Sequence, residues 1–72
     1  MSELERLQRQ IGKRIKELRA ERKMKQKELA AECNLEVTHL SRIEAGGQNL
    51  TLKMLLRIAK ALDVDVLDIF TK

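Results

Sequence analysis

The chain has 72 residues and a formal net charge of +4, with 15 lysines and arginines against 11 acidic residues. We expect one domain over residues 1–72, because this length allows a single hydrophobic core and no more. The apolar residues are aliphatic apart from one Phe, which excludes the aromatic stacking platform of single-stranded nucleic-acid binders.

The composition also argues against catalysis, metal binding and membrane insertion. Cys33 is the only cysteine and His39 the only histidine, so we expect no disulfide, no metal site and no cofactor. Ser41 has no histidine and acid to activate it, so we expect no catalytic residue and no enzyme. No apolar run approaches 18 residues and the N-terminus lacks a signal peptide, which predicts a cytoplasmic protein with no membrane partner.

The first predicted helix covers about residues 3–22. Ser2 and Glu5 have the spacing of a capping box at its start. Apolar residues then recur every three or four positions and define one inward face, made of Leu4, Leu7, Ile11, Ile15 and Leu18.

Two shorter helices follow, at about residues 26–33 and 37–45, and a tight turn joins them. Asn34 follows the first of them at a position that favours a left-handed backbone, which asparagine tolerates well. Gly46 ends the second. The expected inward-facing residues are Leu29, Ala30, Cys33, Leu40 and Ile43. Such a pair of helices is typical of a helix-turn-helix that docks in the DNA major groove.

The last two predicted helices cover about residues 52–62 and 66–71, with Thr51 and Asp65 as their N-caps and Asp68 placed to favour the helix dipole. The inward face of the former is expected to carry Leu52, Leu55, Leu56, Ala59 and Leu62. In the latter, Leu67 and Phe70 are assigned to the core. Val66 and Ile69 then form an exposed apolar patch, which predicts a homodimer interface. The alternative is that this patch packs on the start of the first helix.

Charge is distributed unevenly along the chain. Residues 1–27 carry ten lysines and arginines against four glutamates, whereas residues 28–45 carry Arg42 against four glutamates. A basic flank beside a nearly neutral surface suits phosphate anchoring by one part and base contact by another. For the first helix, an ordinary solvated face is the alternative.

Four segments, in order and at the right spacing, resemble the Cro and phage-repressor (XRE) family. They are IGKRIKELR, QKELA, LSRIEAG and LLRIAKALDVDVLDIF, and the resemblance extends from Ile11 to Phe70. It implies an all-α fold, a compact five-helix lambda-repressor-like DNA-binding domain with its helix-turn-helix at about residues 26–45. The chain departs from the family pattern at four positions. Lys25 and Glu36 replace the usual Ser or Thr caps, Asn34 replaces a glycine in the turn, and Leu50 replaces a proline before the fourth helix. Each departure should lower local stability.

The resemblance also implies residue roles. Base contacts are expected from the outward positions of the recognition helix, Val37, Thr38, His39 and Arg42. Phosphate contacts are expected from Gln26, Lys25, Lys27, Ser41, Gln48, Asn49, Thr51 and Lys53. Arg42 offers the fork that reads guanine O6 and N7, although a phosphate contact is the alternative. Arg19 and Glu44 match a pair that is commonly buried between the first and third helices.

A narrower resemblance is to the controller proteins of restriction-modification systems. Asn49, Leu50 and Thr51 are similar to the entry of the fourth helix in that subfamily, where the position of Gln48 can also reach DNA. The glycines at 46 and 47 do not discriminate between this subfamily and the wider family.

The sequence therefore predicts a transcriptional regulator that binds double-stranded DNA sequence-specifically. One recognition helix reads few base pairs, so we expect a homodimer on a palindromic operator. The alternative is a protein-interaction or antitoxin-like module with the same fold, which the negative charge of residues 28–45 keeps open. No small-molecule ligand is indicated.

Overall fold

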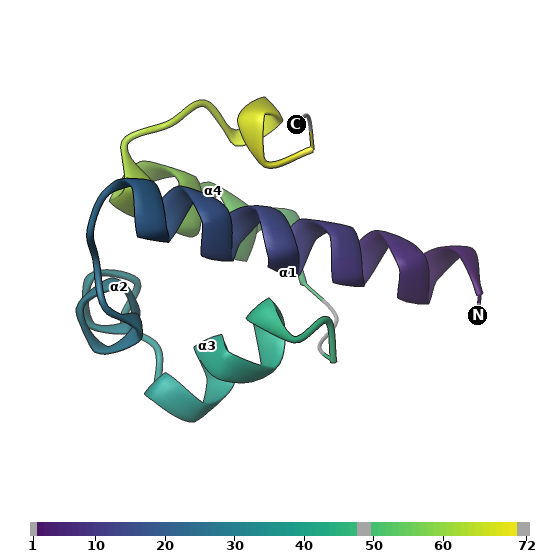
Figure 1. Ribbon diagram of the computed structural model, residues 1–72, viewed down its shortest axis with the longest axis horizontal. Coiled ribbons are helices and arrows are strands. Elements are labelled where there is room, and N and C mark those ends of the chain that lie inside the picture. Colours follow the sequence, from purple (N-terminus) through teal and green to yellow (C-terminus); the bar gives the residue numbers. More distant parts are fainter. Residues whose placement is uncertain (1, 48–49, 71–72) are drawn as a thin grey trace.

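The computed structural model describes residues 2–47 and 50–70, and every secondary-structure element in these residues is a helix. These are α1 (Glu3–Glu21), α2 (Gln26–Glu32), α3 (Val37–Glu44), α4 (Leu52–Leu62) and the short 3-10 helix η1 (Val66–Ile69). In Figure 1, α1 crosses in front of α4, with α2 and α3 on one side of this pair and η1 on the other. The predicted all-helical class is confirmed, but the expected fifth α-helix is a single 3-10 turn.

The helix starts follow from local hydrogen bonding. The Ser2 hydroxyl accepts from the Glu5 amide and the Glu5 carboxylate accepts from the Ser2 amide, both at 3.1 Å, which completes the capping box of α1. Thr51 caps α4 by accepting from the Met54 amide at 3.1 Å. Lys25 gives α2 no side-chain cap, and the Glu28 carboxylate instead accepts from the Lys25 amide at 2.8 Å.

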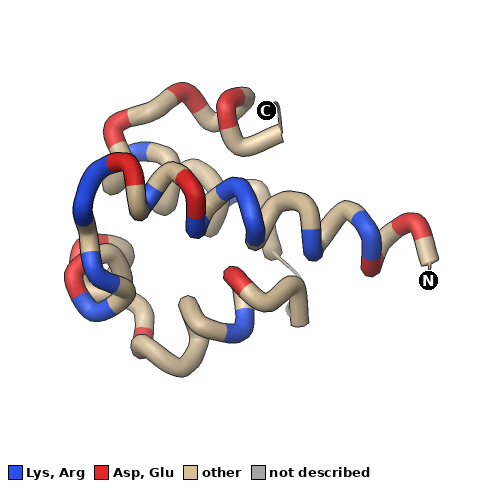
Figure 2. Tube along the Cα trace, viewed as in Figure 1, with Lys and Arg blue, Asp and Glu red and all other residues tan. Residues whose placement is uncertain are grey.

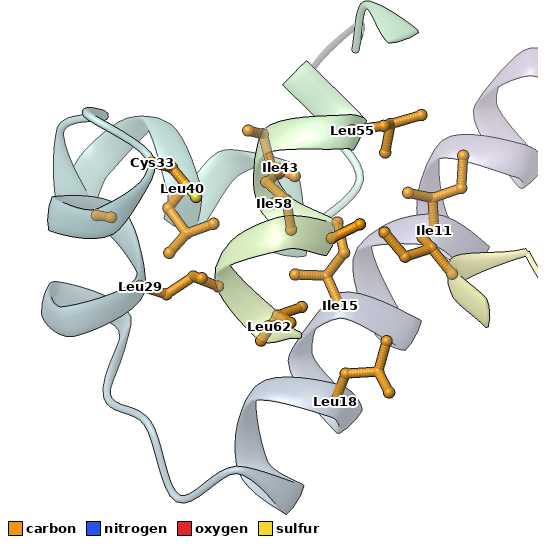
Figure 3. Packing of buried hydrophobic residues seen from close by; sticks show 13 residues of the cluster. Ile11, Ile15, Leu18, Leu29, Cys33, Leu40, Ile43, Leu55, Ile58 and Leu62 are labelled. Atoms are coloured by element: carbon orange, nitrogen blue, oxygen red, sulfur yellow. The ribbon is translucent and has the colours of Figure 1, made fainter. Parts of the chain in front are cut away.

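All four α-helices contribute to one core. Its fully buried side chains include Ile15 from α1, Leu29 from α2, Leu40 and Ile43 from α3, and Ile58 and Leu62 from α4, which converge in Figure 3. Of the predicted stripe on α1, Leu4 and Leu7 lie outside this core and are 57% and 43% exposed. The reason is visible in Figure 1, where the N-terminal part of α1 projects beyond the elements that cover the rest of it.

The predicted inward face of α4 was partly wrong. Leu52 and Leu56 are 74% and 56% exposed, whereas Ile58, which the prediction omitted, is fully buried. The buried residues Leu55, Ile58, Ala59 and Leu62 have the i, i+3, i+4, i+7 spacing of one helix face. Because α4 carries more apolar residues than that face can hold, two leucines remain on the surface.

The predicted orientation of residues 66–70 was also wrong. Ile69 is 1% exposed and Val66 is half-buried, whereas Leu67 is 65% and Phe70 41% exposed. Both pairs are three residues apart, so spacing alone could not choose between them. The entry of the chain decides the choice: Asp63 has a left-handed backbone (φ 57), and the half-buried Val64 then sets which side of η1 meets the core.

Within residues 2–47 and 50–70, none of the helices has the length and apolar character needed to cross a membrane.

Candidate nucleic-acid interface

The turn between α2 and α3 fixes the angle of the two helices. Asn34 has φ 58, the left-handed conformation expected for it. The Leu35 amide donates to the Ala30 carbonyl at 2.8 Å and thereby closes the end of α2. Leu29 and Leu40 are fully buried on the two helices. The segment 26–44 therefore has the helix-turn-helix geometry that the sequence predicted.

Helix α3 separates its buried and exposed residues sharply. Leu40, Ile43 and Glu44 are buried. The exposed side carries four of the residues discussed as DNA contacts, Val37, Thr38, Ser41 and Arg42. Among the described residues the side chain of Arg42 has no hydrogen bond or ion pair, so its guanidinium fork is available for an acceptor. His39 differs from these four because it is half-buried.

The only carboxylate within α3 is buried and paired. Arg19 Nε lies 2.8 Å from Glu44 Oε2 and Arg19 Nη2 lies 3.0 Å from Glu44 Oε1, a bidentate pair between α1 and α3. The Glu44 side chain is 4% and the Arg19 side chain 14% exposed. Arg19 Nη1 also donates to the Met24 carbonyl at 2.9 Å. The resemblance had implied this pairing, and it leaves the outer side of α3 free of negative charge.

Gln26, the first residue of α2, takes part in the same network. Its Nε2 donates to Glu44 Oε1 at 2.9 Å, and the side chain is half-buried. The prediction from sequence missed this bond, because residues 18 positions apart give no local signal of contact. An amide nitrogen has two N–H groups, so Gln26 keeps one donor for a phosphate while Glu44 holds the side chain in place.

Gly12 allows α1 and α3 to approach closely. A Cβ atom added at Gly12 would lie 2.3 Å from the Ile43 carbonyl oxygen and 2.6 Å from that of Glu44. Gly46, which ends α3 with φ 82, lies against Arg9 of α1 in the same way. The sequence carried a signal for this contact, since a glycine inside a helical pattern often marks close backbone approach.

The other predicted phosphate-contacting residues belong to the starts of α2 and α4 and to the segment that precedes α4. Lys25 and Lys27 are exposed at the start of α2, and Thr51 and Lys53 are exposed at the start of α4. The Thr51 hydroxyl oxygen accepts from Met54 in the helix cap, which leaves its O–H group as a donor. Gln48 and Asn49 lie outside the described residues.

Cys33 at the end of α2 belongs to the core. The residue is 2% exposed, and its Sγ lies 3.9 Å from the Arg57 carbonyl oxygen of α4. Burial and then the nearby Glu32 raise the pKa of the thiol, against a smaller opposite effect of Arg57. In the described part of the chain no cluster of three or more His, Cys, Asp or Glu side chains is placed to hold a metal ion.

The geometry just described defines a helix-turn-helix protein, and comparison with known families agrees. The helix-turn-helix family model matches residues 15–69, and the chain belongs to that family. Family membership makes the chain a DNA-binding transcriptional regulator and not an enzyme.

Several restriction-modification controller proteins are among the similar proteins. The chain is 39% identical over 65 residues to the control protein C.BamHI of Bacillus amyloliquefaciens, which covers 85% of this chain and 80% of that protein. The crystal structure of the controller protein C.AhdI of Aeromonas hydrophila has a TM-score of 0.84 and 31% identity, covering 86% of this chain and 94% of that one. The controller protein C.Esp1396I, solved as a tetramer with its natural 35 base-pair operator, has a TM-score of 0.81 and 37% identity, covering 97% and 88%.

Proposed function

We propose that the chain is a controller-type regulator that binds a palindromic operator as a homodimer, with one α3 helix of each copy in the major groove. The observation that carries this proposal is the exposed side of α3. It combines Arg42, whose side chain is unpaired among the described residues, with the methyl-bearing side chains of Val37 and Thr38, beside the buried and neutralised carboxylate of Glu44. Family membership and the similarity to three controller proteins support it. Because the proposed target is operator DNA, we infer that the protein acts in the cytoplasm.

The residues of α3 suit direct reading of base edges. Arg42 can donate two parallel hydrogen bonds to guanine O6 and N7, and the methyl groups of Val37 and Thr38 can contact thymine C5-methyl groups. Ser41, on the same exposed side, can donate to a base or phosphate oxygen. His39 is half-buried, so we assign it a smaller part in base contact than Arg42.

Phosphate contacts on either side of α3 position the helix in the groove. We assign Lys25, Gln26 and Lys27 at the start of α2 to one strand. Thr51 and Lys53 at the start of α4 are assigned to the other, with Gln48 and Asn49 of the preceding segment. These contacts carry no sequence information and confer the salt dependence of binding.

The dimer surface is assigned to residues other than those first predicted, because Ile69 is buried within its own copy. The exposed apolar side chains at the projecting end of α1, on α4 and around η1 are Leu4, Leu7, Leu52, Leu56, Leu67 and Phe70. Several of them, with Ile11 and Leu55, line one shallow apolar groove. A second copy of this chain is the proposed occupant, since an exposed apolar patch of this size usually marks an interface and a 37% identical relative assembles on its operator as a tetramer.

Selection of bound sequences from a random pool of duplexes tests this function directly. We expect a palindromic consensus, and titration with salt should then weaken binding steeply while the preference for the selected sequence persists. Recovery of no preferred duplex, or binding that is indifferent to salt, would contradict the proposal.

A further inference from the structure

The basic residues of α1 are not all used in holding the fold together. Figure 2 shows lysines and arginines along α1, whereas α3 is mostly uncharged. Arg14 donates to the Asp68 carbonyl at 2.8 Å and lies 3.7 Å from Glu17, and Arg6 lies 3.2 Å from Glu3. Of the remaining cations in the first four turns, Lys13 and Lys16 form no ion pair within the described residues.

Arg9, Lys13 and Lys16 form one continuous row on the helix surface. Their spacing is i, i+4 and i+7, which places neighbouring members next to one another on the same face. All three are exposed, and no acidic residue occurs between positions 6 and 16. Glu5, one turn before Arg9, marks the N-terminal limit of the row, where its carboxylate is held by the Ser2 cap. That hydrogen bonding lowers the pKa of Glu5, with a smaller contribution from Arg9.

This row borders the contact between α1 and the recognition helix. Gly12, three residues after Arg9, touches the carbonyl groups at the end of α3. Arg19, three residues after Lys16, holds Glu44. Arg9 itself lies against Gly46 in the turn that ends α3. The row therefore follows the side of α1 that adjoins α3 and keeps a fixed position relative to it.

We propose that Arg9, Lys13 and Lys16 form a basic ridge that binds the phosphate backbone of duplex DNA beside the segment that α3 reads. This inference rests on the proposed function, and it adds contacts to those of the helix-turn-helix. Arg9 and Lys13 also precede residue 15, where the match to the family model begins. Seven residues of α-helix span about 10 Å, and one DNA strand presents a phosphate every 3.4 Å or so along the axis. The ridge can thus face about three phosphates.

The test compares two double variants that remove the same charge. Lys13→Gln with Lys16→Gln alters the ridge, and Arg57→Gln with Lys60→Gln alters exposed residues of α4 as the matched control. Binding to the selected operator half-site and to a random duplex is measured at several salt concentrations, and thermal melts verify folding. A half-site keeps dimer assembly out of the measurement.

The ridge variant should reduce the slope of log affinity against log salt by about 0.9 per lost contact, so about 1.8 in total. The ridge variant should weaken binding to the half-site and to the random duplex by the same factor. The α4 control should change the salt dependence of binding to either duplex only by the small amount expected from the lower net charge. Adding Arg9→Gln should reduce the slope further by a similar step.

The outcomes separate the two levels of the proposal. If the unmodified chain shows no salt-dependent, sequence-preferring binding, the proposed function fails. If it does bind in that way but the ridge variant matches the α4 control, only the ridge is wrong. A larger loss at the half-site than at the random duplex would also overturn the ridge, because the residues would then be reading sequence.

Discussion

Arg42 is the side chain whose position on α3 best suits base recognition. It is exposed and unpaired among the described residues, and the carboxylate in its own helix is already neutralised by Arg19. We expect Arg42→Ala to weaken binding to the selected operator by about 1–3 kcal/mol and to relax the preference at one base position. Competition binding with single-base operator variants measures both effects. Arg57→Ala on α4 is the control, and an unchanged preference for Arg42→Ala would rule out base reading by this residue.

The Glu44 carboxylate connects α3 to α1 and α2. It accepts hydrogen bonds from Arg19 and Gln26, and the Glu44 side chain is 4% exposed. Glu44→Ala leaves a mostly buried guanidinium without its partner, so we expect a loss of about 3–5 kcal/mol in the free energy of unfolding. In a domain of this size that loss approaches the whole stability. Denaturant unfolding measures it.

Replacing both residues of the ion pair distinguishes two costs. One is the cost of leaving a buried arginine unpaired, and the other is the loss of the stabilisation that the pair itself provides. Changing Arg19→Met together with Glu44→Leu removes both charges, so the double variant should be more stable than Glu44→Ala alone. Equal losses in the two proteins would mean that the pair is strongly stabilising in itself.

The position of Asn34 requires a residue that can adopt a left-handed backbone, and it requires no particular side-chain contact. Its φ of 58 is accessible to glycine without strain, but a β-branched residue adopts it at a cost of about 1–3 kcal/mol. Asn34→Gly should therefore melt at or slightly above the temperature of the unmodified chain, and Asn34→Val clearly below it. Indistinguishable melting temperatures would contradict the left-handed turn.

At the level of elements, local signals predicted the four α-helices and the Asp65 cap at the start of η1, but they did not predict which face of η1 meets the core. Ser2 with Glu5, Thr51 and Asn34 each mark a boundary through their own hydrogen bonding or backbone preference, and the structure places α1, α4 and the turn where these residues indicate. The face of η1 depends instead on the direction in which the chain leaves α4 at Asp63 and on the packing of Val64 against the core. The same limit applies to Gln26, whose bond to Glu44 crosses between helices.

The fit of α1 against α3 makes a strong prediction about two glycines. Gly12→Ala places a methyl group about as close as 2.3 Å to the Ile43 carbonyl oxygen, so the helices must move apart. Overpacking of this kind costs about 1–3 kcal/mol, which exceeds the gain of roughly 1 kcal/mol in helix propensity. Gly47→Ala is the matched control, because its added Cβ would be 3.7 Å from the nearest atom, the Arg42 carbonyl oxygen. Thermal melts should show a marked decrease only for Gly12→Ala.

At the level of the whole molecule, assembly depends on the apolar side chains that the core leaves outside. Leu4 is 57% and Phe70 41% exposed, and both line the same groove. Changing both to Asp should give a folded monomer with a large loss of affinity for the full palindrome and little loss for a half-site. Light scattering and half-site binding measure the two effects, with Ala20→Asp as an exposed control on α1.

Ile69→Asp cannot serve the same purpose. Since Ile69 is 1% exposed, a charge there should unfold the chain and not merely dissociate it. A folded, monomeric Ile69→Asp protein would show that η1 lies on the surface and would restore the interface first expected from the sequence. An unmodified chain that stays monomeric above its DNA-binding concentration would exclude either interface.

The buried thiol of Cys33 has a further consequence. It is the only cysteine of the chain and lies where α2 meets α4, so an alkylating reagent reaches it only when these helices separate. When reclosing is faster than alkylation, the rate of labelling measures the free energy of that local opening. DNA bound to α2 and α3 should slow the alkylation of Cys33 in proportion to the fraction of the protein that is bound. The wild-type chain thus contains a kinetic probe of helix-turn-helix integrity at a single atom, with no label added to the DNA-binding face.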